Sequence, residues 1–327
     1  MKNPPNFYRG RFAPSPTGPL HFGSMVAAVG SYLDARAHGG EWLVRIEDID
    51  APRAVAGAAD GILRTLEGFG FEWDGEVVYQ SRRLDRYHAA LSRLQLAGWV
   101  YPCSCSRNVI ASSSARRSLD GSLVYPGTCR GGLPDGVAAR AWRLRVPDRE
   151  FVARDRVQGK ACQNLEREVG DFVLLRADGQ YAYQLAVVVD DAAQGINHVV
   201  RGADLLDSTA RQVWLLQCLG CPAPSYAHLP VAVNRAGEKL SKQTRAPAVD
   251  PARGVGLLAC VLRFLGQPVS AETEAMTLAE FWRWAIGAWD LSNVPAARAI
   301  PADPAASKFG YGEKRNSSKA EIAGSCQ

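Results

Sequence analysis

The apolar positions of the first hundred residues follow the periods of alternating strands and helices. A short apolar segment, Phe7-Tyr8, precedes a Pro/Gly-rich turn at residues 11–24, and an amphipathic helical pattern follows over residues 25–37. Residues 41–46 have the pattern of a strand, and residues 50–70 that of a helix with an Asp cap and an early Pro. This strand–helix–strand–helix order predicts the first half of a doubly wound parallel sheet, and so an α/β fold.

The regular pattern stops at residue 101 and resumes near residue 166. The interval holds clustered cysteines, a serine run and several Gly and Pro turn signals, which favour an insertion with its own small structure. Apolar elements then return, including a short buried strand at 229–233, and two helical patterns follow. We therefore predict five parts: the first half of the α/β domain at 1–100, an inserted subdomain at 101–165, the second half of the α/β domain at 166–245, a helical subdomain at 246–300, and a disordered tail at 301–327.

Two loops carry residue types suited to anions. The first is His21-Phe22-Gly23-Ser24, at the start of the first helix, where unpaired backbone N–H groups and the positive end of the helix dipole lie together. The second is Lys239-Leu240-Ser241-Lys242-Gln243, which follows the buried strand at 229–233 and a turn. Taken alone, the first could be a capping His with a Gly for close packing, and the second a solvated surface turn. Their combination favours a phosphate site.

Composition and charge limit the function only loosely. The 327 residues carry a formal net charge of +5, which is compatible with a polyanionic partner but does not require one. No apolar run reaches the length of a membrane span, and the N-terminal residues lack the apolar core of a signal peptide. We expect a cytoplasmic protein without a membrane partner, acting as a monomer.

The eight cysteines raise the question of a metal. In a chain without an export signal they argue against a disulfide framework. Cys103 and Cys105 are separated by one residue, and Cys129 follows in the same irregular interval. The pair Cys218 and Cys221 ends an apolar helix, which favours core packing over ligation.

The two anion loops together resemble the two signature motifs of class I aminoacyl-tRNA synthetases. Pro-Ser-Pro-Thr-Gly-Pro-Leu-His-Phe-Gly-Ser, at 14–24, resembles the first signature, and Lys-Leu-Ser-Lys-Gln, at 239–243, resembles the second. The preceding Arg-Phe-Ala and the later Arg45-Ile46-Glu47-Asp48 resemble the glutamyl branch of that family. The resemblance covers roughly residues 8–245. It implies a Rossmann-type catalytic domain, split by an acceptor-binding insertion, that uses ATP with Mg²⁺ to activate an amino acid as its adenylate.

The resemblance also implies a role for individual residues. Catalysis falls to His21 and Lys242, and ATP binding to His21, Gly23, Ser24, Lys239 and Lys242, because fixed donors and cations stabilise the charge that develops on the phosphates. L-glutamate binding falls to Arg11, Phe12, Ala13, Pro14, Ser15, Glu47, Tyr183 and Arg201, with arginine suited to a side-chain carboxylate and Glu47 to the α-ammonium. The alternatives are a surface ion pair of Glu47 with Arg45 and a helix-cap contact of Arg201 with Asp204.

The insertion resembles the zinc-binding insertion of the glutamyl branch. That resemblance implies one structural Zn²⁺ held by Cys103, Cys105, Tyr125 and Cys129, since thiolates suit zinc and a small loop-rich unit gains stability from a metal. Tyrosine is a rare ligand, so Cys162 is a competing fourth ligand. The remaining alternative is that no metal binds.

Two departures narrow the resemblance within the branch. Ser24 stands where full-length glutamyl-tRNA synthetases usually carry His, and only residues 246–300 have helical patterns where those enzymes continue into a large anticodon-binding region. Both features resemble the truncated glutamyl-queuosine tRNA(Asp) synthetases. These activate glutamate without tRNA and transfer it to queuosine in the anticodon of tRNA(Asp), where splayed loop bases are accessible. The alternatives are a shortened glutamyl-tRNA synthetase that esterifies a tRNA 3′ end, a non-catalytic RNA-binding relic, and an adenylate-forming nucleotidyltransferase without an RNA partner.

Overall fold

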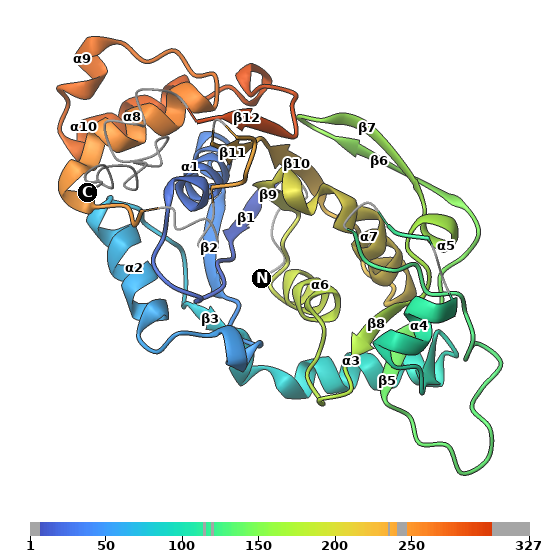
Figure 1. Cartoon of the computed structure of the whole chain (residues 1–327). Coiled ribbons are helices and arrows are strands. Elements are labelled where there is room, and N and C mark those ends of the chain that lie inside the picture. The colour runs from blue at the N-terminus through green and yellow to red at the C-terminus, as the bar shows by residue number, and fades with distance from the viewer. Residues whose placement is uncertain (1–6, 114–115, 119–120, 235, 241–246, 303–327) are drawn as a thin grey trace, which may run out of the picture.

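The computed structural model describes residues 7–113, 116–118, 121–234, 236–240 and 247–302 (Figure 1). Lys242, two of its neighbours in the second signature loop, Ser241 and Gln243, and the predicted tail from residue 303 onward lie outside the described residues.

A parallel sheet forms the centre of the fold. Strands β1 (Arg9–Phe12), β2 (Glu41–Ile46) and β3 (Val78–Tyr79) pair in parallel, as do β9 (His198–Gly202) and β10 (Ser225–Leu229). Strand β9 lies beside β1, where the Asn197 N–H donates to the Arg9 carbonyl at 3.2 Å. The strand order is β3-β2-β1-β9-β10, with β2 and β3 on one side of β1 and β9 and β10 on the other. The predicted doubly wound sheet is therefore confirmed. Ligands bind such sheets at the carboxyl ends of the strands, where the winding reverses.

Helix α1 (Phe22–Ala37) is more deeply buried than its amphipathic pattern predicts. One side packs against β1, β2 and β9. The other side is covered by α8 (Gly254–Phe264) and α10 (Leu278–Ala288), as Figure 1 shows. The predicted helices at 246–300 therefore do not stand apart, because their apolar side chains belong to the same core as those of α1 and β2.

A second core lies on the other side of the sheet. It is built from α3 (Leu84–Leu96), α6 (Tyr183–Ala193) and α7 (Thr209–Cys218). The predicted helix at 50–70 is interrupted: a 3₁₀ turn at Ala51–Arg53 is followed by α2 (Ala58–Gly68). Gly57, with φ 74°, turns the chain between them, a conformation that favours glycine.

The irregular interval forms an antiparallel sheet of β4 (Val100–Cys103), β5 (Ala141–Leu144) and β8 (Phe172–Leu175), with α4 (Arg107–Ser113) beside it. Because β8 lies beyond residue 165, we propose that the inserted unit ends between β8 and α6. The hairpin of β6 (Glu150–Asp155) and β7 (Gly159–Asn164) adds to the central sheet, where Asp155 pairs with Tyr226 of β10.

Short elements complete the chain. They are the 3₁₀ turns Gln80–Arg82, Ala203–Ser208, Pro251–Arg253 and Leu291–Asn293, the helices α5 (Leu165–Glu168) and α9 (Ala271–Glu274), and the parallel pair β11 (Val231–Val233) and β12 (Ala299–Pro301).

The close packing of α1 on the sheet gives a testable prediction. A β carbon on Gly30 would lie 2.5 Å from the Cδ1 atom of Leu229, which is fully buried. Gly30→Ala should therefore lower the free energy of unfolding by about 1–3 kcal/mol through overpacking, measured by denaturant unfolding. Gly61→Ala in α2 is the matched control, since its β carbon would meet nothing within 4 Å. The control should be neutral or more stable by up to about 1 kcal/mol. Equal stability of the two variants would contradict the packing argument.

Candidate active site

A cavity of about 350 Å³ opens at the carboxyl ends of β1 and β9, beside the first turn of α1. It is the place where a doubly wound sheet binds its ligand. The structure brings residues of both predicted halves to this one cavity. Its wall includes Arg11, Phe12, Ala13, Ser15, Glu47, Tyr183 and Arg201 from the predicted glutamate set, and His21, Gly23, Ser24 and Lys239 from the predicted ATP set. Their binding roles stay predictions.

Pro14 differs from the other predicted substrate residues. It is not part of the cavity wall, but its carbonyl accepts the Glu47 N–H at 3.0 Å. This bond joins the loop after β1 to the end of β2, so Pro14 holds Glu47 beside the cavity through its backbone.

His21 is both the N-cap of α1 and part of the cavity wall. Its Nδ1 accepts the backbone N–H of Ser24 at 3.3 Å, so in the neutral ring the proton is on Nε2, which can donate to a phosphate. The Ser24 N–H, expected to serve as a ligand donor, is therefore used by the cap. A β carbon on Gly23 would lie 3.2 Å from the Leu240 carbonyl oxygen, so glycine lets the second signature loop approach the helix.

Lys239 stands at the edge of the cavity in an ion pair with Asp204. The Nζ–Oδ2 distance is 2.6 Å, and the two side chains are 48% and 39% exposed. An exposed pair of this kind contributes little to stability, so Lys239 can change partner at small cost.

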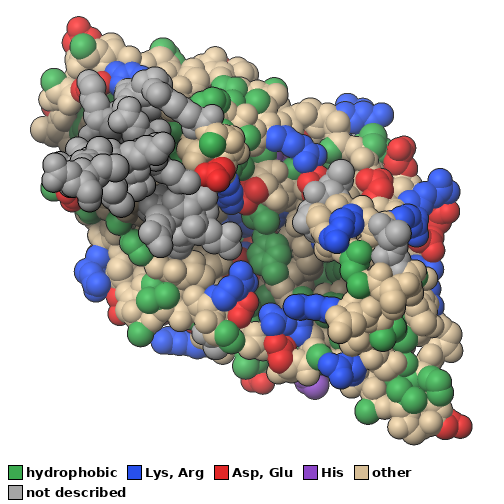
Figure 2. All heavy atoms as spheres, viewed as in Figure 1, with side chains coloured by type: hydrophobic (Ala, Val, Ile, Leu, Met, Phe, Trp, Pro, Cys, Tyr) green, Lys and Arg blue, Asp and Glu red, His purple; other side chains and the backbone are tan. Residues whose placement is uncertain are grey.

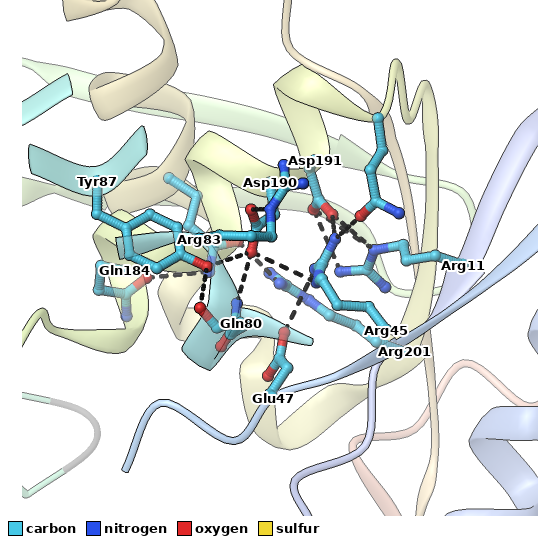
Figure 3. A network of polar contacts seen from close by, with 12 residues as sticks. Arg11, Arg45, Glu47, Gln80, Arg83, Tyr87, Gln184, Asp190, Asp191 and Arg201 are labelled. Carbon is cyan, nitrogen blue, oxygen red and sulfur yellow. Dashed lines mark hydrogen bonds and ion pairs between the residues drawn. The ribbon is translucent and has the colours of Figure 1, made fainter. Parts of the chain in front are cut away.

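A network of alternating charges (Figure 3) adjoins the glutamate half of the cavity, and two of its members, Arg11 and Glu47, belong to the cavity wall. The fully buried Arg45 contacts Asp191 at 2.7 Å and Glu47 at 3.3 Å. Asp191 also lies 3.2 Å from the Nε of Arg11. The alternative for Glu47 was a surface ion pair with Arg45. The ion pair is present, but it is buried and not on the surface.

The pKa values of the two carboxylates in this charge network, Asp191 and Glu47, are shifted in opposite directions. Burial raises the pKa of Asp191, but the charges of Arg11 and Arg45 outweigh it, so the pKa is lowered and the group stays ionised. Burial also raises the pKa of Glu47, and Arg45 and Arg11 offset that effect only in part. The positive charge around Glu47 therefore offsets its burial less completely than at Asp191, which favours acceptance of an ammonium group.

Asp190 and Asp191 were missed by reasoning from sequence. Asp190 is fully buried and accepts from Arg83 at 2.6 Å, Tyr87 at 2.7 Å and Gln80 at 2.9 Å, as Figure 3 shows. The signal that could have found both residues is their position directly after the apolar run Leu185–Val189 of α6, where a surface helix would not place two acids.

Arg201 is a buried residue of the cavity wall, and the alternative cap contact with Asp204 is not what holds it. Its Nη1 donates to Gln212 at 2.8 Å and its Nη2 to the Leu205 carbonyl at 3.2 Å, while Asp204 pairs with Lys239. Tyr183, at the start of α6, completes this wall, and burial raises its pKa.

The cysteine cluster of the insertion has the shape of a metal site. The sulfur atoms of Cys103, Cys105 and Cys129 lie within 4.8 Å of one another. The Tyr125 hydroxyl is 3.4 Å from the sulfur of Cys103 and 3.8 Å from that of Cys105. Cys162 is exposed on β7 and is not part of this group.

Two further expectations can be compared with the structure. Cys218 and Cys221 pack against the second core, as predicted. Among the described residues, no helix has both the length and the apolar character that a membrane span requires.

Comparison with known proteins agrees with the fold. Residues 8–283 match the family of class I tRNA synthetases (E and Q), catalytic domain. A glutamate–tRNA synthetase structure from Elizabethkingia anophelis superposes with a TM-score of 0.76 at 27% identity, over 93% of this chain and 70% of that one. The glutamate–tRNA ligase of Elizabethkingia meningosepticum, solved with its amino acid, gives 0.75 at 28% identity, over 92% and 68%. The chain therefore belongs to the class I tRNA synthetases of the glutamyl and glutaminyl type, and the predicted fold class is confirmed.

Sequence relatives define the branch within that class. The chain is 64% identical over 293 residues to a glutamyl-Q tRNA(Asp) synthetase from Dechloromonas aromatica, covering 90% of this chain and 97% of the relative. A protein of the same name from Chromobacterium violaceum is 61% identical, with 88% and 96% covered. Within the class, the chain belongs with the glutamyl-Q tRNA(Asp) synthetases.

The raised pKa of Glu47 gives a prediction for stability against pH. Ionising Glu47 disfavours the folded state, so Glu47→Gln should increase the free energy of unfolding at pH 7. The gain should disappear as the pH falls below the unfolded-state pKa of about 4.3, where the carboxyl is neutral in both states. Denaturant unfolding across the acid range measures the difference.

The exposed Glu67 of α2 provides the control for this comparison. Glu67→Gln should change stability by less than about 0.5 kcal/mol at either pH. A Glu47→Gln variant that is less stable than wild type at pH 7 would mean that the pair with Arg45 outweighs burial.

Proposed function

We propose that this chain activates L-glutamate with ATP, without tRNA, and transfers the glutamyl group to queuosine in the anticodon of tRNA(Asp). One observation carries the proposal: a helix N-terminus suited to phosphate and a cluster of guanidinium groups suited to carboxylate share one cavity. The names of the 64% and 61% identical relatives support the choice of acceptor. The enzyme is then an ATP-dependent ligase.

In the first step, an oxygen of the glutamate α-carboxylate attacks the α-phosphorus of ATP. The bond from that phosphorus to the bridging oxygen breaks, which gives glutamyl-adenylate and pyrophosphate. The His21 Nε2–H and the start of α1 stabilise the added negative charge, and Lys239 reaches the phosphates by leaving Asp204. Lys242, from the same loop, is proposed as the main phosphate cation, and Mg²⁺ arrives bound to the ATP phosphates.

The other half of the cavity selects the amino acid. Arg11, Arg45 and Arg201 supply three positive charges against the two negative charges of Glu47 and Asp191, so the site favours a ligand with a net negative charge. The guanidinium groups of Arg11 and Arg201 hold the side-chain carboxylate, and Glu47 accepts the α-ammonium. Phe12, Ala13, Ser15 and Tyr183 form the walls around the ligand.

In the second step, a hydroxyl oxygen of the queuosine cyclopentenediol attacks the acyl carbon of the adenylate. The new ester forms as AMP leaves, and the hydroxyl proton is released. The face in Figure 2 is hollowed near its centre, with Lys and Arg side chains around the hollow alongside Asp and Glu side chains, and the basic side chains suit an RNA strand. The likeness to the Elizabethkingia synthetases keeps a second candidate: esterification of a tRNA 3′ end.

The cysteine cluster is proposed to hold one structural Zn²⁺ through Cys103, Cys105, Cys129 and Tyr125. The spacing fits, because ligands about 2.3 Å from zinc in a tetrahedron lie about 3.8 Å apart, and the Cys105 and Cys129 sulfurs are 3.5 Å apart. Arg143 donates to the Cys103 sulfur at 3.2 Å, an outer contact that favours the thiolate. Zinc would cross-link the loop at 103–105 to the turn at 125–129.

Pyrophosphate exchange tests the first step. The purified protein should exchange labelled pyrophosphate into ATP when L-glutamate is present and all tRNA is absent, and L-glutamine should give no exchange. Lys242→Ala should reduce exchange about a hundredfold or more, while circular dichroism stays unchanged. Exchange that requires tRNA would contradict tRNA-independent activation.

The acceptor is tested with labelled glutamate and purified tRNAs. Label should enter tRNA(Asp) that contains queuosine, and it should remain in the anticodon fragment after nuclease digestion. The same tRNA with guanosine in place of queuosine is the matched control and should stay unlabelled. Label at the 3′ end of tRNA(Glu) would favour the second candidate.

Metal analysis tests the zinc site. The wild-type protein should contain about one Zn²⁺ per chain, and Cys129→Ser should lose it and unfold at lower temperature. Cys162→Ser is the control, because Cys162 is exposed on β7 and outside the sulfur cluster. Zinc lost from the Cys162 variant would make Cys162 the fourth ligand.

A further inference from the structure

Arg201 is held in place by an unusually complete set of acceptors. Its Nε donates to His228 at 2.9 Å, its Nη1 to Gln212, and its Nη2 to the Leu205 carbonyl and to Thr209 at 3.2 Å. Four of the five N–H groups of the guanidinium therefore have acceptors within the protein. The plane of Arg201 is fixed before any ligand arrives.

The contact with His228 requires one tautomer of the imidazole ring. Arginine is always a donor, so the His228 Nε2 that faces it must be unprotonated. The ring proton is then on Nδ1, which donates to Asp155 Oδ2 at 2.6 Å. Burial lowers the pKa of His228, the hydrogen bond to Asp155 raises it in part, and the charge of Arg201 lowers it again, so the ring is neutral.

Asp155 is in turn fixed by the backbone of two strands. Its Oδ1 accepts the N–H groups of Val157, Gln158 and His228 at 2.8–3.0 Å, and its side chain is only 1% exposed. The turn of the β6–β7 hairpin and strand β10 thus hold the carboxylate, with Oδ2 left facing the imidazole. None of this reaches the cavity directly, because neither Asp155 nor His228 is part of its wall.

We propose that Asp155 and His228 are positioning residues for amino-acid recognition: Asp155 selects the Nδ1–H tautomer of His228, and His228 orients Arg201 toward the carboxylate of the substrate. This inference rests on the proposed function, in which Arg201 binds glutamate. It assigns the β6–β7 hairpin, which lies outside the cavity, a part in setting the affinity for glutamate.

Asp155→Asn provides a sharp test because it keeps the shape and turns the acceptor that faces His228 into a donor. Three backbone N–H groups face the Oδ1 position, so the amide oxygen must occupy it and the NH₂ group must face His228. The His228 Nδ1 then becomes the acceptor, its proton moves to Nε2, and that N–H opposes the Nε–H of Arg201. Two donors facing each other cannot bond, so Arg201 loses the acceptor of its Nε and is held only through Nη1 and Nη2.

In pyrophosphate exchange, Asp155→Asn should raise the KM for glutamate about tenfold or more, while the KM for ATP stays within about twofold of wild type. Nitrogen-15 NMR of labelled histidine should show the His228 Nδ1–H tautomer in wild type and Nε2–H in the variant. Asp171→Asn is the control: Asp171 is also buried, but it bonds Tyr101 and Arg130 away from the cavity and from the β6–β7 hairpin. It should lower stability and leave the KM for glutamate unchanged.

A second pair of variants keeps the test valid if Asp155→Asn does not fold. His228→Gln can place an acceptor where Nε2 was, whereas His228→Asn reaches only the Nδ1 position and the contact with Asp155. The Gln variant should retain a KM for glutamate closer to wild type than the Asn variant. Equal losses in the two variants, or a rise in both KM values together, would overturn the positioning role.

The NMR readout separates this inference from the proposed function. If wild type shows the Nδ1–H tautomer but no glutamate-dependent exchange, the proposed function fails on its own. If exchange occurs and wild type shows the Nε2–H tautomer, the positioning role is wrong while the proposed function stands.

Discussion

One buried carboxylate, Asp191 of α6, holds the substrate half of the cavity together. It lies between Arg11 of β1 and Arg45 of β2, which are 180 and 146 residues away in the sequence. Two guanidinium groups could not lie so close in a buried site without an anion between them. Removing one partner of a buried ion pair typically costs about 3–5 kcal/mol, because the other charge is left uncompensated. The docking of α6 on the sheet and the positions of the arginines are therefore set by the same contact.

The fold was predictable from sequence because its signals are local. The strand at 41–46 follows from its apolar period alone, and the structure has it at the same residues. The cavity residues were predictable only through the two signature motifs together, because neither His21 nor Lys239 indicates a phosphate site by itself. Asp191, Asp155 and His228 could not be found in this way. A buried charged residue looks like a surface residue in sequence until its distant partner is known.

The contrast between Asp191 and Glu47 separates structural charge from binding charge. Both contact Arg45, yet the pKa of Asp191 is lowered and that of Glu47 is raised. Asp191 has two arginines at short distance, whereas Glu47 has one contact at 3.3 Å. A ligand ammonium supplies the missing charge beside Glu47, so binding should stabilise the fold as well as fill the site. In the ligand-free protein the negative charge of Glu47 is only partly balanced, and this lowers the free energy of unfolding of that state.

A buried Asp that accepts from a Tyr and an Arg recurs at three places where distant segments meet. The Asp accepts from a Tyr hydroxyl and an Arg in each case: Asp34 with Tyr8 and Arg156, Asp171 with Tyr101 and Arg130, and Asp190 with Tyr87 and Arg83. A buried carboxylate accepts such contacts only in one geometry, so each cluster fixes one junction. The first joins α1 to the hairpin turn, the second holds the cysteine loop on its sheet, and the third seats α6 on α3. Asp190 and Asp191 are adjacent, so the junction of α6 and the arrangement of the substrate arginines cannot vary independently.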